Sequence, residues 1–279
     1  MSTARDASRG GPGGSRVWTD AVRLATGTLT TVRVRPPGRI DRARAGRAML
    51  LAPAVGLVPA GAGALAGGIA GQLGASTTVC AVLAVAGAAW LSRGLHLDGL
   101  ADTADGLAAA YDRDRALEVM RRGDTGPAGV VTLVLVVALQ VAALTQAWGR
   151  YGATAALVVL SLGRLALPWA CRRGVAAARP DGLGATVAGS VPVPAALAVT
   201  VLAWLAAVVG LAAGAAHSGV TDVVDAAVPA AAAVTAAVLA CVILVRRCRS
   251  RLGGITGDVL GATVELSSAA CAFALVLAG

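Results

Sequence analysis

Three aspartates with helical spacing are the residues of this sequence best suited to chemistry. Asp98, Asp102 and Asp105 stand at positions i, i+4 and i+7 of the segment 93–107. In a helix this spacing places all three carboxylates within roughly 60° of one face, over about 10 Å. Carboxylates so close together repel one another unless a cation lies among them. Because hard cations prefer oxygen ligands, the spacing predicts a site for Mg²⁺ or Mn²⁺ that also takes up substrate phosphate.

The residues between these aspartates are mostly leucine, alanine and glycine. Apolar filler at a membrane boundary disfavours the alternative interpretation, a solvated acidic loop paired with nearby arginines. His96 is expected on the opposite face of the helix, and zinc would need more Cys and His ligands. The glycines of the segment (Gly94, Gly99 and Gly106) disfavour a helix interior, but they would let a bulky ligand approach the backbone.

A second acidic pair follows a glycine turn near the C-terminus. Asp258 and Glu265 are seven residues apart, and therefore share a helix face. Glu265 is expected about two turns into the bilayer, where an unpaired carboxylate costs several kcal/mol. Both a functional role and a structural one remain open, the latter being a buried pair with Arg164.

The segment 118–129 has two interpretations. Pro127 opens an apolar run next to Arg121 and Arg122, and a helix start with free N–H groups beside arginines suits a phosphate. The same arginines could equally be an orientation signal in a cytoplasmic loop.

The elements that must position these residues are membrane helices. The chain has 279 residues, of which 57% are hydrophobic and 14% charged, whereas about a quarter of the residues in a soluble domain are charged. This composition excludes a disordered chain, and five scattered cysteines do not suggest a disulfide scaffold. The predicted fold class is therefore all-α, a multi-pass membrane protein with about seven transmembrane helices. The expected spans are residues 49–71, 77–92, 128–148, 153–170, 191–216, 226–245 and 259–277.

The arginines predict the orientation of these spans. Ten of the 24 basic residues lie in the first 47 positions, and most of the others lie in loops on the same side of the membrane. The positive-inside rule then places the N-terminus in the cytoplasm and the C-terminus outside, with the acidic segments on the cytoplasmic side of the cell (plasma) membrane. The basic character is explained by these loops, so no nucleic-acid partner is expected.

Two regions are predicted, a basic cytoplasmic tail over residues 1–47 and a single membrane-embedded catalytic domain over residues 48–279. Apolar residues from Trp18 to Leu29 recur at helical spacing. This pattern suits either a short helix at the membrane surface or a plain tail.

Carboxylates, glycine turns and arginines gathered on the cytoplasmic face are typical of enzymes that transfer a phosphodiester group. Two classes of protein fit the residues alone: a metal-dependent membrane transferase and an ion-coupled transporter. A transporter should place its acids near the bilayer midplane, often with repeat symmetry. No repeat is visible and the acids concentrate at one interface, so a transferase is preferred.

The runs from His96 to Gly106 and from Gly253 to Ala262 resemble the two signature segments of the cobalamin synthase family, the adenosylcobinamide-GDP ribazoletransferases. The resemblance extends from about Val17 to the C-terminus. It implies a multi-pass enzyme that uses Mg²⁺ to join α-ribazole, or its 5′-phosphate, to adenosylcobinamide-GDP. GMP is released, and adenosylcobalamin or its 5′-phosphate is formed.

The resemblance also implies roles for particular residues. Asp98, Asp102, Asp105 and Asp258 are expected to be the catalytic and metal-binding residues. A larger set is expected to contact substrate: His96, Arg93, Arg121, Arg122, Asp124, Arg164, Gly253, Gly254, Thr256 and Glu265. The lipid bilayer is an expected partner, and a homo-oligomer is left open.

Two stretches depart from the family pattern. Residues 29–33 read Leu-Thr-Thr-Val-Arg where members commonly have Leu-Thr-Arg-hydrophobic-Pro, and residues 120–124 read Met-Arg-Arg-Gly-Asp where many have Met-Lys-Asp-Ser. The alternative family is a CDP-alcohol phosphotransferase-like enzyme, but its Ala-Arg pair after the second Asp-Gly is replaced here by Leu107-Ala-Ala. A cobalt or corrinoid transporter would need His- or Met-rich segments, which the sequence lacks.

Overall fold

The structure is a computed structural model that describes residues 13–109, 112–216 and 223–279, and within them it contains α-helices and one short 3-10 helix but no β-strand. The all-α prediction is confirmed. In chain order the elements are α1 (Gly13–Leu29), α2 (Arg42–Val55), α3 (Leu57–Gln72), α4 (Thr77–Leu91), α5 (Leu95–Ala109), α6 (Arg113–Arg122), α7 (Pro127–Tyr151), α8 (Ala153–Leu162), η1 (Gly163–Leu165), α9 (Ala166–Ala170), α10 (Gly182–Val187), α11 (Val193–Ala215), α12 (Val223–Leu252) and α13 (Gly257–Ala278).

Six helical stretches of the described chain are long and apolar enough to cross a membrane, and a seventh span results if α4 and α5 count as one broken span. The expectation of about seven spans agrees with this. The second expected span is short because the chain bends by 89° between α4 and α5. This bend turns the aspartate segment away from the direction of the span that leads into it.

The helices form a bundle whose central members are covered on all sides. In the most apolar stretch of each span, the share of residues that are buried is 78% for Ala153–Ala170 and 67% for Gly257–Ala278. The share is only 22% for Val193–Ala215. Helices α8, α9 and α13 therefore occupy the centre, while α11 faces outward. Exposed leucines and valines such as Leu202 and Val209 on α11 are expected where a helix faces lipid.

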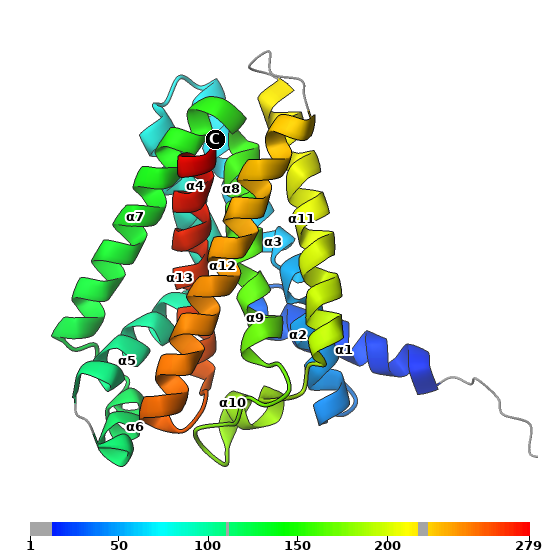
Figure 1. Ribbon diagram of the computed structural model, residues 1–279, viewed down its shortest axis with the longest axis vertical. Helices are drawn as coiled ribbons and strands as arrows, with labels where there is room; N and C mark the ends of the chain where they lie inside the picture. The colour runs from blue at the N-terminus through cyan, green and yellow to red at the C-terminus, as the bar shows by residue number, and fades with distance from the viewer. Residues whose placement is uncertain (1–12, 110–111, 217–222) are drawn as a thin grey trace, which may run out of the picture.

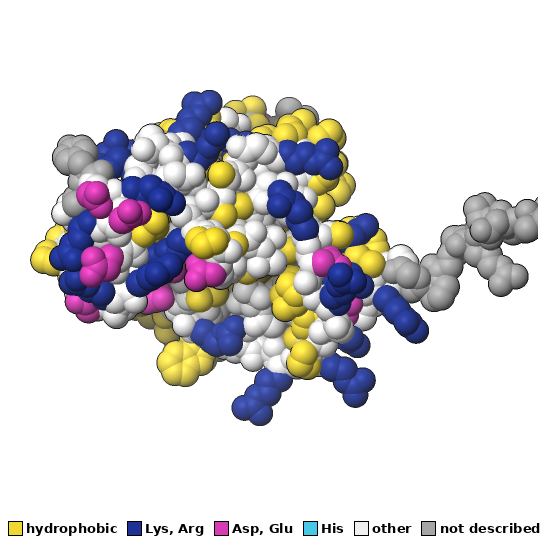
Figure 2. All heavy atoms as spheres, turned by 90° about the horizontal axis from the view of Figure 1, so that it is seen from below, with side chains coloured by type: hydrophobic (Ala, Val, Ile, Leu, Met, Phe, Trp, Pro, Cys, Tyr) yellow, Lys and Arg dark blue, Asp and Glu magenta, His cyan; other side chains and the backbone are white. Residues whose placement is uncertain are grey.

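At one end of the bundle lie the short helices α5, α6 and α10, and the C-terminus lies at the other end (Figure 1). Viewed from below, the end with the short helices carries many arginine and acidic side chains (Figure 2). The structure contains no membrane, so the predicted N-in, C-out orientation stays a prediction.

The helix predicted between Trp18 and Leu29 is present as α1, which runs across the long axis of the bundle near its lower end (Figure 1). It is fixed to α2 by Arg44, whose Nε donates to Asp20 Oδ2 at 2.8 Å. Asp41 accepts from the Arg44 backbone N–H and caps α2, which therefore begins before the predicted end of the tail at residue 47. The division into tail and catalytic domain, and the position of α1 at a membrane surface, remain predictions.

Candidate functional site

The two signature segments meet where α5 crosses α13. A Cβ on Gly99 of α5 would lie 2.5 Å from the Asp258 carbonyl oxygen, and one on Gly261 of α13 would lie 3.1 Å from the His96 Cα. Only glycine allows the two backbones to approach so closely. Gly99 and Gly106, which faces Met120 of α6, serve helix packing, and this corrects the expectation that they admit a bulky ligand; for Gly94, where an added Cβ meets no described atom within 4 Å, the expectation stays a prediction.

The crossing brings three carboxylates into one region. Asp98 and Asp258 line the same cavity, and Asp102 is buried beside them, close enough to both for electrostatic repulsion. Among the described residues, however, no three His, Cys, Asp or Glu side chains are arranged to hold a metal ion by themselves. Any cation bound here would therefore need further ligands from outside the protein.

Asp105 points to a different helix. Its carboxylate oxygens accept hydrogen bonds from the backbone N–H groups of Gly126, at 2.7 Å, and of Gly129, at 2.8 Å. It thereby caps the N-terminus of α7 from a neighbouring helix, where a negative charge also complements the helix dipole. The prediction that this helix start has free N–H groups for a phosphate is wrong, because a side chain of the protein occupies it.

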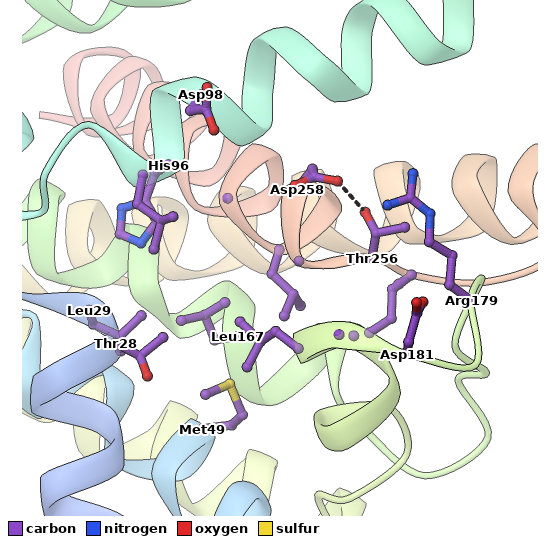
Figure 3. Close-up of a pocket in the computed structure, with 18 of the residues that line it drawn as sticks. Thr28, Leu29, Met49, His96, Asp98, Leu167, Arg179, Asp181, Thr256 and Asp258 are labelled. Atoms are coloured by element: carbon purple, nitrogen blue, oxygen red, sulfur yellow. Dashed lines mark hydrogen bonds between the residues drawn. The ribbon is translucent and has the colours of Figure 1, made fainter. Parts of the chain in front are cut away.

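A cavity of about 390 Å³ opens beside the crossing of α5 and α13. One end is charged and polar, with Thr256, Arg179 and Asp181 around it, and Asp258 lies between this end and Asp98, which is nearer to His96 (Figure 3). Thr256 donates its hydroxyl to Asp258 Oδ2 at 3.1 Å and accepts from a backbone N–H as the N-cap of α13.

Arginines supply the positive charge at this end. The Arg179 Nη2 donates to the Leu117 carbonyl oxygen at 2.6 Å. Partial burial lowers the pKa of Arg179 from its usual value, and the Asp258 carboxylate opposes that shift. Arginine nevertheless stays protonated, because its ordinary pKa is above 12. Arg121 also lines the cavity and lies 3.7 Å from Asp181.

The other end of the cavity is apolar. Leu29 of α1, Met49 of α2 and Leu167 of α9 form it, and the His96 ring lies beside them (Figure 3). All four residues are at most 4% exposed. His96 was expected on the face of α5 opposite the aspartates, yet it lines the same cavity as Asp98, because this cavity extends around the start of the helix.

Behind the cavity lies a buried polar layer. Glu265 Oε2 accepts from Gln140 Nε2 at 2.9 Å, and Glu265 Oε1 lies 3.9 Å from His96 Nδ1. The Arg164 guanidinium donates to the Leu160 carbonyl oxygen and interacts with Glu265 only electrostatically. The predicted pairing of Glu265 with Arg164 is thus no direct ion pair; Gln140, which the sequence analysis missed, provides the contact. Neither Glu265 nor Arg164 lines the cavity.

Arg93 occupies the turn between α4 and α5 and has a φ of 59°, the only positive value at a non-glycine residue in the described chain. Its Nη2 donates to the Gly27 carbonyl oxygen at 2.8 Å and lies 3.4 Å from that of Thr28. The side chain expected to contact substrate therefore links the C-terminal end of α1 to the start of α5.

The remaining predicted contacts lie outside the cavity. Arg122 forms an ion pair with Glu118 at 2.8 Å, and Asp124 is exposed. Hydrogen bonds from Arg122 and then Arg115 hold the pKa of Glu118 below its usual value. Of the two neighbouring arginines, only Arg121 reaches the cavity.

The glycine turn before α13 is packed against protein. A Cβ on Gly254 would lie 2.3 Å from the Ala176 carbonyl oxygen, and Gly253 adjoins Arg113. Arg113 donates to the carbonyl oxygens of Leu252 and Ala178, which holds the turn against the loop before α10. Of this signature segment only the part from Ile255 onward lines the cavity.

The sequence analysis missed several cavity residues because they carry no chemical signal of their own. Thr28, Leu29, Met49 and Leu167 belong to ordinary apolar stretches of three separate helices. The loop that contains Arg179 was not missed: Gly182 and Gly184 after Arg179-Pro-Asp predict a loop that could line a ligand entrance, and these residues do line the cavity.

The fold and the cavity together define a class: a multi-pass helical membrane protein with an acidic and arginine-lined site at one end of its bundle. Residues 21–276 match the cobalamin-5-phosphate synthase family. The chain therefore belongs to this family, and it is an enzyme, a transferase of cobalamin biosynthesis. The resemblance seen in the two signature segments is confirmed.

Curated relatives are similar over most of their length. An adenosylcobinamide-GDP ribazoletransferase of Nocardioides sp. is 46% identical over 254 residues, which are 90% of this chain and 96% of the relative. Proteins of the same name from Frankia casuarinae and Bradyrhizobium diazoefficiens are 40% and 34% identical, over 89% and 86% of this chain and 91% and 87% of their own. No solved structure matches the chain.

Proposed function

We propose that this enzyme joins α-ribazole, or its 5′-phosphate, to adenosylcobinamide-GDP, with release of GMP and formation of adenosylcobalamin or its 5′-phosphate. The single observation that carries the proposal is the cavity at the crossing of α5 and α13. It is lined by Asp98 and Asp258, one from each signature segment, and by Arg179, which interacts electrostatically with Asp258. The substrates are inferred from the names of the relatives, which are adenosylcobinamide-GDP ribazoletransferases.

Mg²⁺ fits the donor set of this site. The available ligands are carboxylate oxygens: Asp102 interacts electrostatically with Asp98 and Asp258, and Asp258 with Asp98. The described side chains form no three-ligand cage, but Mg²⁺ is usually held by one or two carboxylates and completed by water and substrate phosphates. We therefore assign the cation to one or two carboxylates of the group Asp98, Asp102 and Asp258 together with the diphosphate, and we assign Asp105 to the support of α7. Bound there, Mg²⁺ would neutralise phosphate charge.

The other residues of the charged end have roles that follow from their positions. Arg121 and Arg179 face the region of the diphosphate and stabilise the charge that develops on GMP as it leaves. The attacking group is a ribose hydroxyl of the ribazole substrate. Its oxygen forms a bond to the phosphorus attached to cobinamide, the bond from that phosphorus to the GMP oxygen breaks, and a carboxylate of the cluster accepts the hydroxyl proton.

We further propose that the site faces the cytoplasm from the cell membrane. The arginine-rich loops of the sequence support this orientation. So does the location of α5, α6 and α10 at the end of the bundle opposite the C-terminus (Figure 1).

The test is an assay with purified protein in lipid nanodiscs. Adenosylcobinamide-GDP, α-ribazole and Mg²⁺ are supplied, and both GMP and the joined corrinoid are quantified by chromatography. Equal amounts of the two products, formed only when all three components are present, are the expected result. GMP released without the joined corrinoid would mean hydrolysis and would refute the proposed transfer.

A further inference from the structure

We propose that the apolar end of the cavity is the binding site for the aromatic base of the ribazole substrate, and that the corrin ring stays outside the cavity. This inference rests on the proposed function. It is carried by the size of the cavity, by the separation of its polar and apolar walls, and by the small number of polar groups among the apolar residues.

Size decides which substrate can enter. The cavity holds about 390 Å³, near the lower limit of the roughly 300–1,000 Å³ that small-molecule pockets span. A ribonucleoside with a bicyclic base is small enough for this volume. A cobalt corrin that carries a nucleoside diphosphate and a deoxyadenosyl group is several times larger. Only its diphosphate could reach Asp98 and Asp258 in the cavity.

The walls place the base at the end away from the phosphates. Leu29, Met49 and Leu167 surround the apolar end, opposite Arg179 and Asp181 (Figure 3). The base of α-ribazole is a benzimidazole with two methyl groups, so its burial there removes apolar surface from water. The Met49 thioether is a favourable neighbour for an aromatic ring. The attached ribose then extends toward the carboxylates, where its hydroxyl must react.

The polar inventory of this end distinguishes the ribazole base from guanine, the other base in the reaction. Guanine carries a carbonyl, a ring N–H and an amino group on one edge, and each would be costly to bury without a partner. A benzimidazole nucleoside has a single free ring nitrogen. The polar side chains at this end are Thr28 and His96 (Figure 3). His96 is 2% exposed, neither ring nitrogen has a hydrogen-bond partner among the described residues, and Nδ1 lies 3.9 Å from Glu265 Oε1. So few polar groups match a base with one free ring nitrogen far better than they match guanine.

Two helices at the N-terminal end of the chain complete this pocket. Leu29 belongs to α1, whose last carbonyl groups accept from Arg93, and Met49 belongs to α2. The N-terminal region therefore forms part of the substrate site as well as the surface of the protein.

The test measures binding as well as turnover. Free 5,6-dimethylbenzimidazole is added to the wild-type enzyme, and it should compete with α-ribazole while it leaves the KM for adenosylcobinamide-GDP within twofold. Leu167→Phe, which fills the apolar end, should raise both the KM and the dissociation constant of α-ribazole at least tenfold, the latter measured by benzimidazole fluorescence. Leu202→Phe makes the same change on the outer face of α11, where Leu202 is 65% exposed, and should alter neither.

The inference is overturned if the free base competes with adenosylcobinamide-GDP. It is also overturned if Leu167→Phe raises the KM for adenosylcobinamide-GDP and leaves the KM and the dissociation constant of α-ribazole unchanged. Either result would assign the apolar end to guanine or to the corrinoid. The binding measurement does not depend on turnover. A wild-type protein that binds α-ribazole but forms no joined product would refute the proposed function and leave the base site supported.

Discussion

The cap that Asp105 provides to α7 leads to a stability prediction that separates its role from that of the other aspartates. A Cβ added to Gly129 would lie 2.3 Å from Asp105 Oδ2, closer than a real Cβ approaches any oxygen. The carboxylate must therefore move, which strains or breaks its bonds to the N–H groups of Gly126 and Gly129. Gly129→Ala should consequently destabilise the protein, although alanine is normally the better helix former.

The magnitude follows from the contacts. Overpacking costs about 1–3 kcal/mol, and a hydrogen bond to a charged group contributes about 1.5–3 kcal/mol. With partial relaxation we expect a loss of about 2–4 kcal/mol, which lowers the apparent melting temperature of a protein of this size by about 4–16 °C. Asp105→Asn should lower the free energy of unfolding by about 1–3 kcal/mol, because the asparagine NH₂ group is a donor and cannot accept from one of the two buried backbone N–H groups.

The assay is thermal unfolding of the purified protein in detergent, followed by tryptophan fluorescence. The matched control is Gly149→Ala near the other end of the same helix, where an added Cβ meets nothing within 4 Å. This control should melt at the wild-type temperature or slightly above it. The double variant Gly129→Ala/Asp105→Asn should lose less than the sum of the single losses, since both changes disrupt the same contact.

Two results would refute this reasoning. Gly129→Ala could melt like Gly149→Ala, which would mean that the carboxylate does not occupy the first turn of α7. Alternatively, Asp105→Asn could leave the melting temperature unchanged and raise the Mg²⁺ concentration needed for half-maximal activity. Asp105 would then be a metal ligand and not a cap.

Three further predictions concern the metal site, the docking of α1 and the orientation in the membrane. Asp102→Asn should lower turnover at least about 100-fold without lowering the melting temperature, because it removes a buried charge that neighbouring carboxylates repel; a variant that unfolds would contradict this. The Gly38 backbone N–H and the Arg44 guanidinium hold the pKa of Asp20 below its usual value. The Asp20 carboxylate therefore stabilises the folded protein above about pH 4, and this stabilisation is lost as the pH falls through the lowered pKa. The difference in melting temperature between wild type and Asp20→Asn should therefore shrink below pH 4, and a constant difference would argue against the pairing. With the buried native cysteines replaced, a cysteine at Leu73 should react with an impermeant maleimide only from outside the cell and one at Asp114 only from inside; the reverse pattern would invert the topology.

Much of the helical framework could be predicted from the sequence because it depends on short-range properties. Six of the seven predicted apolar stretches correspond to helical stretches long enough to cross a membrane, and the second, residues 77–92, reaches that length only together with α5. The amphipathic pattern near Trp18 predicted α1. The two signature segments were recognised without any structure, because their residues and their order are specific.

The positions of the functional side chains were predicted less well. The i, i+4, i+7 spacing placed three aspartates on one helix face, but a face about 60° wide can touch two different neighbours. Asp98 lines the cavity and Asp102 is repelled by Asp98 and Asp258, while Asp105, two turns beyond Asp98, meets the start of α7. In the same way, the family resemblance implied substrate contacts for Arg93 and Arg122, but Arg93 bonds to the end of α1 and Arg122 pairs with Glu118.

What the sequence determined by itself was the class of molecule: an arginine-rich, multi-pass helical enzyme with acidic signature segments. Hydrophobic length and local spacing are properties of contiguous residues, so a single chain displays them directly. Only the tertiary structure decided that Leu29, Met49 and Leu167 share one cavity with Asp98 and Asp258. These residues come from five helices. Whether they meet depends on where glycines such as Gly99 allow two helices to pack closely and on which polar groups form hydrogen bonds across the bundle. No local sequence pattern encodes these long-range contacts.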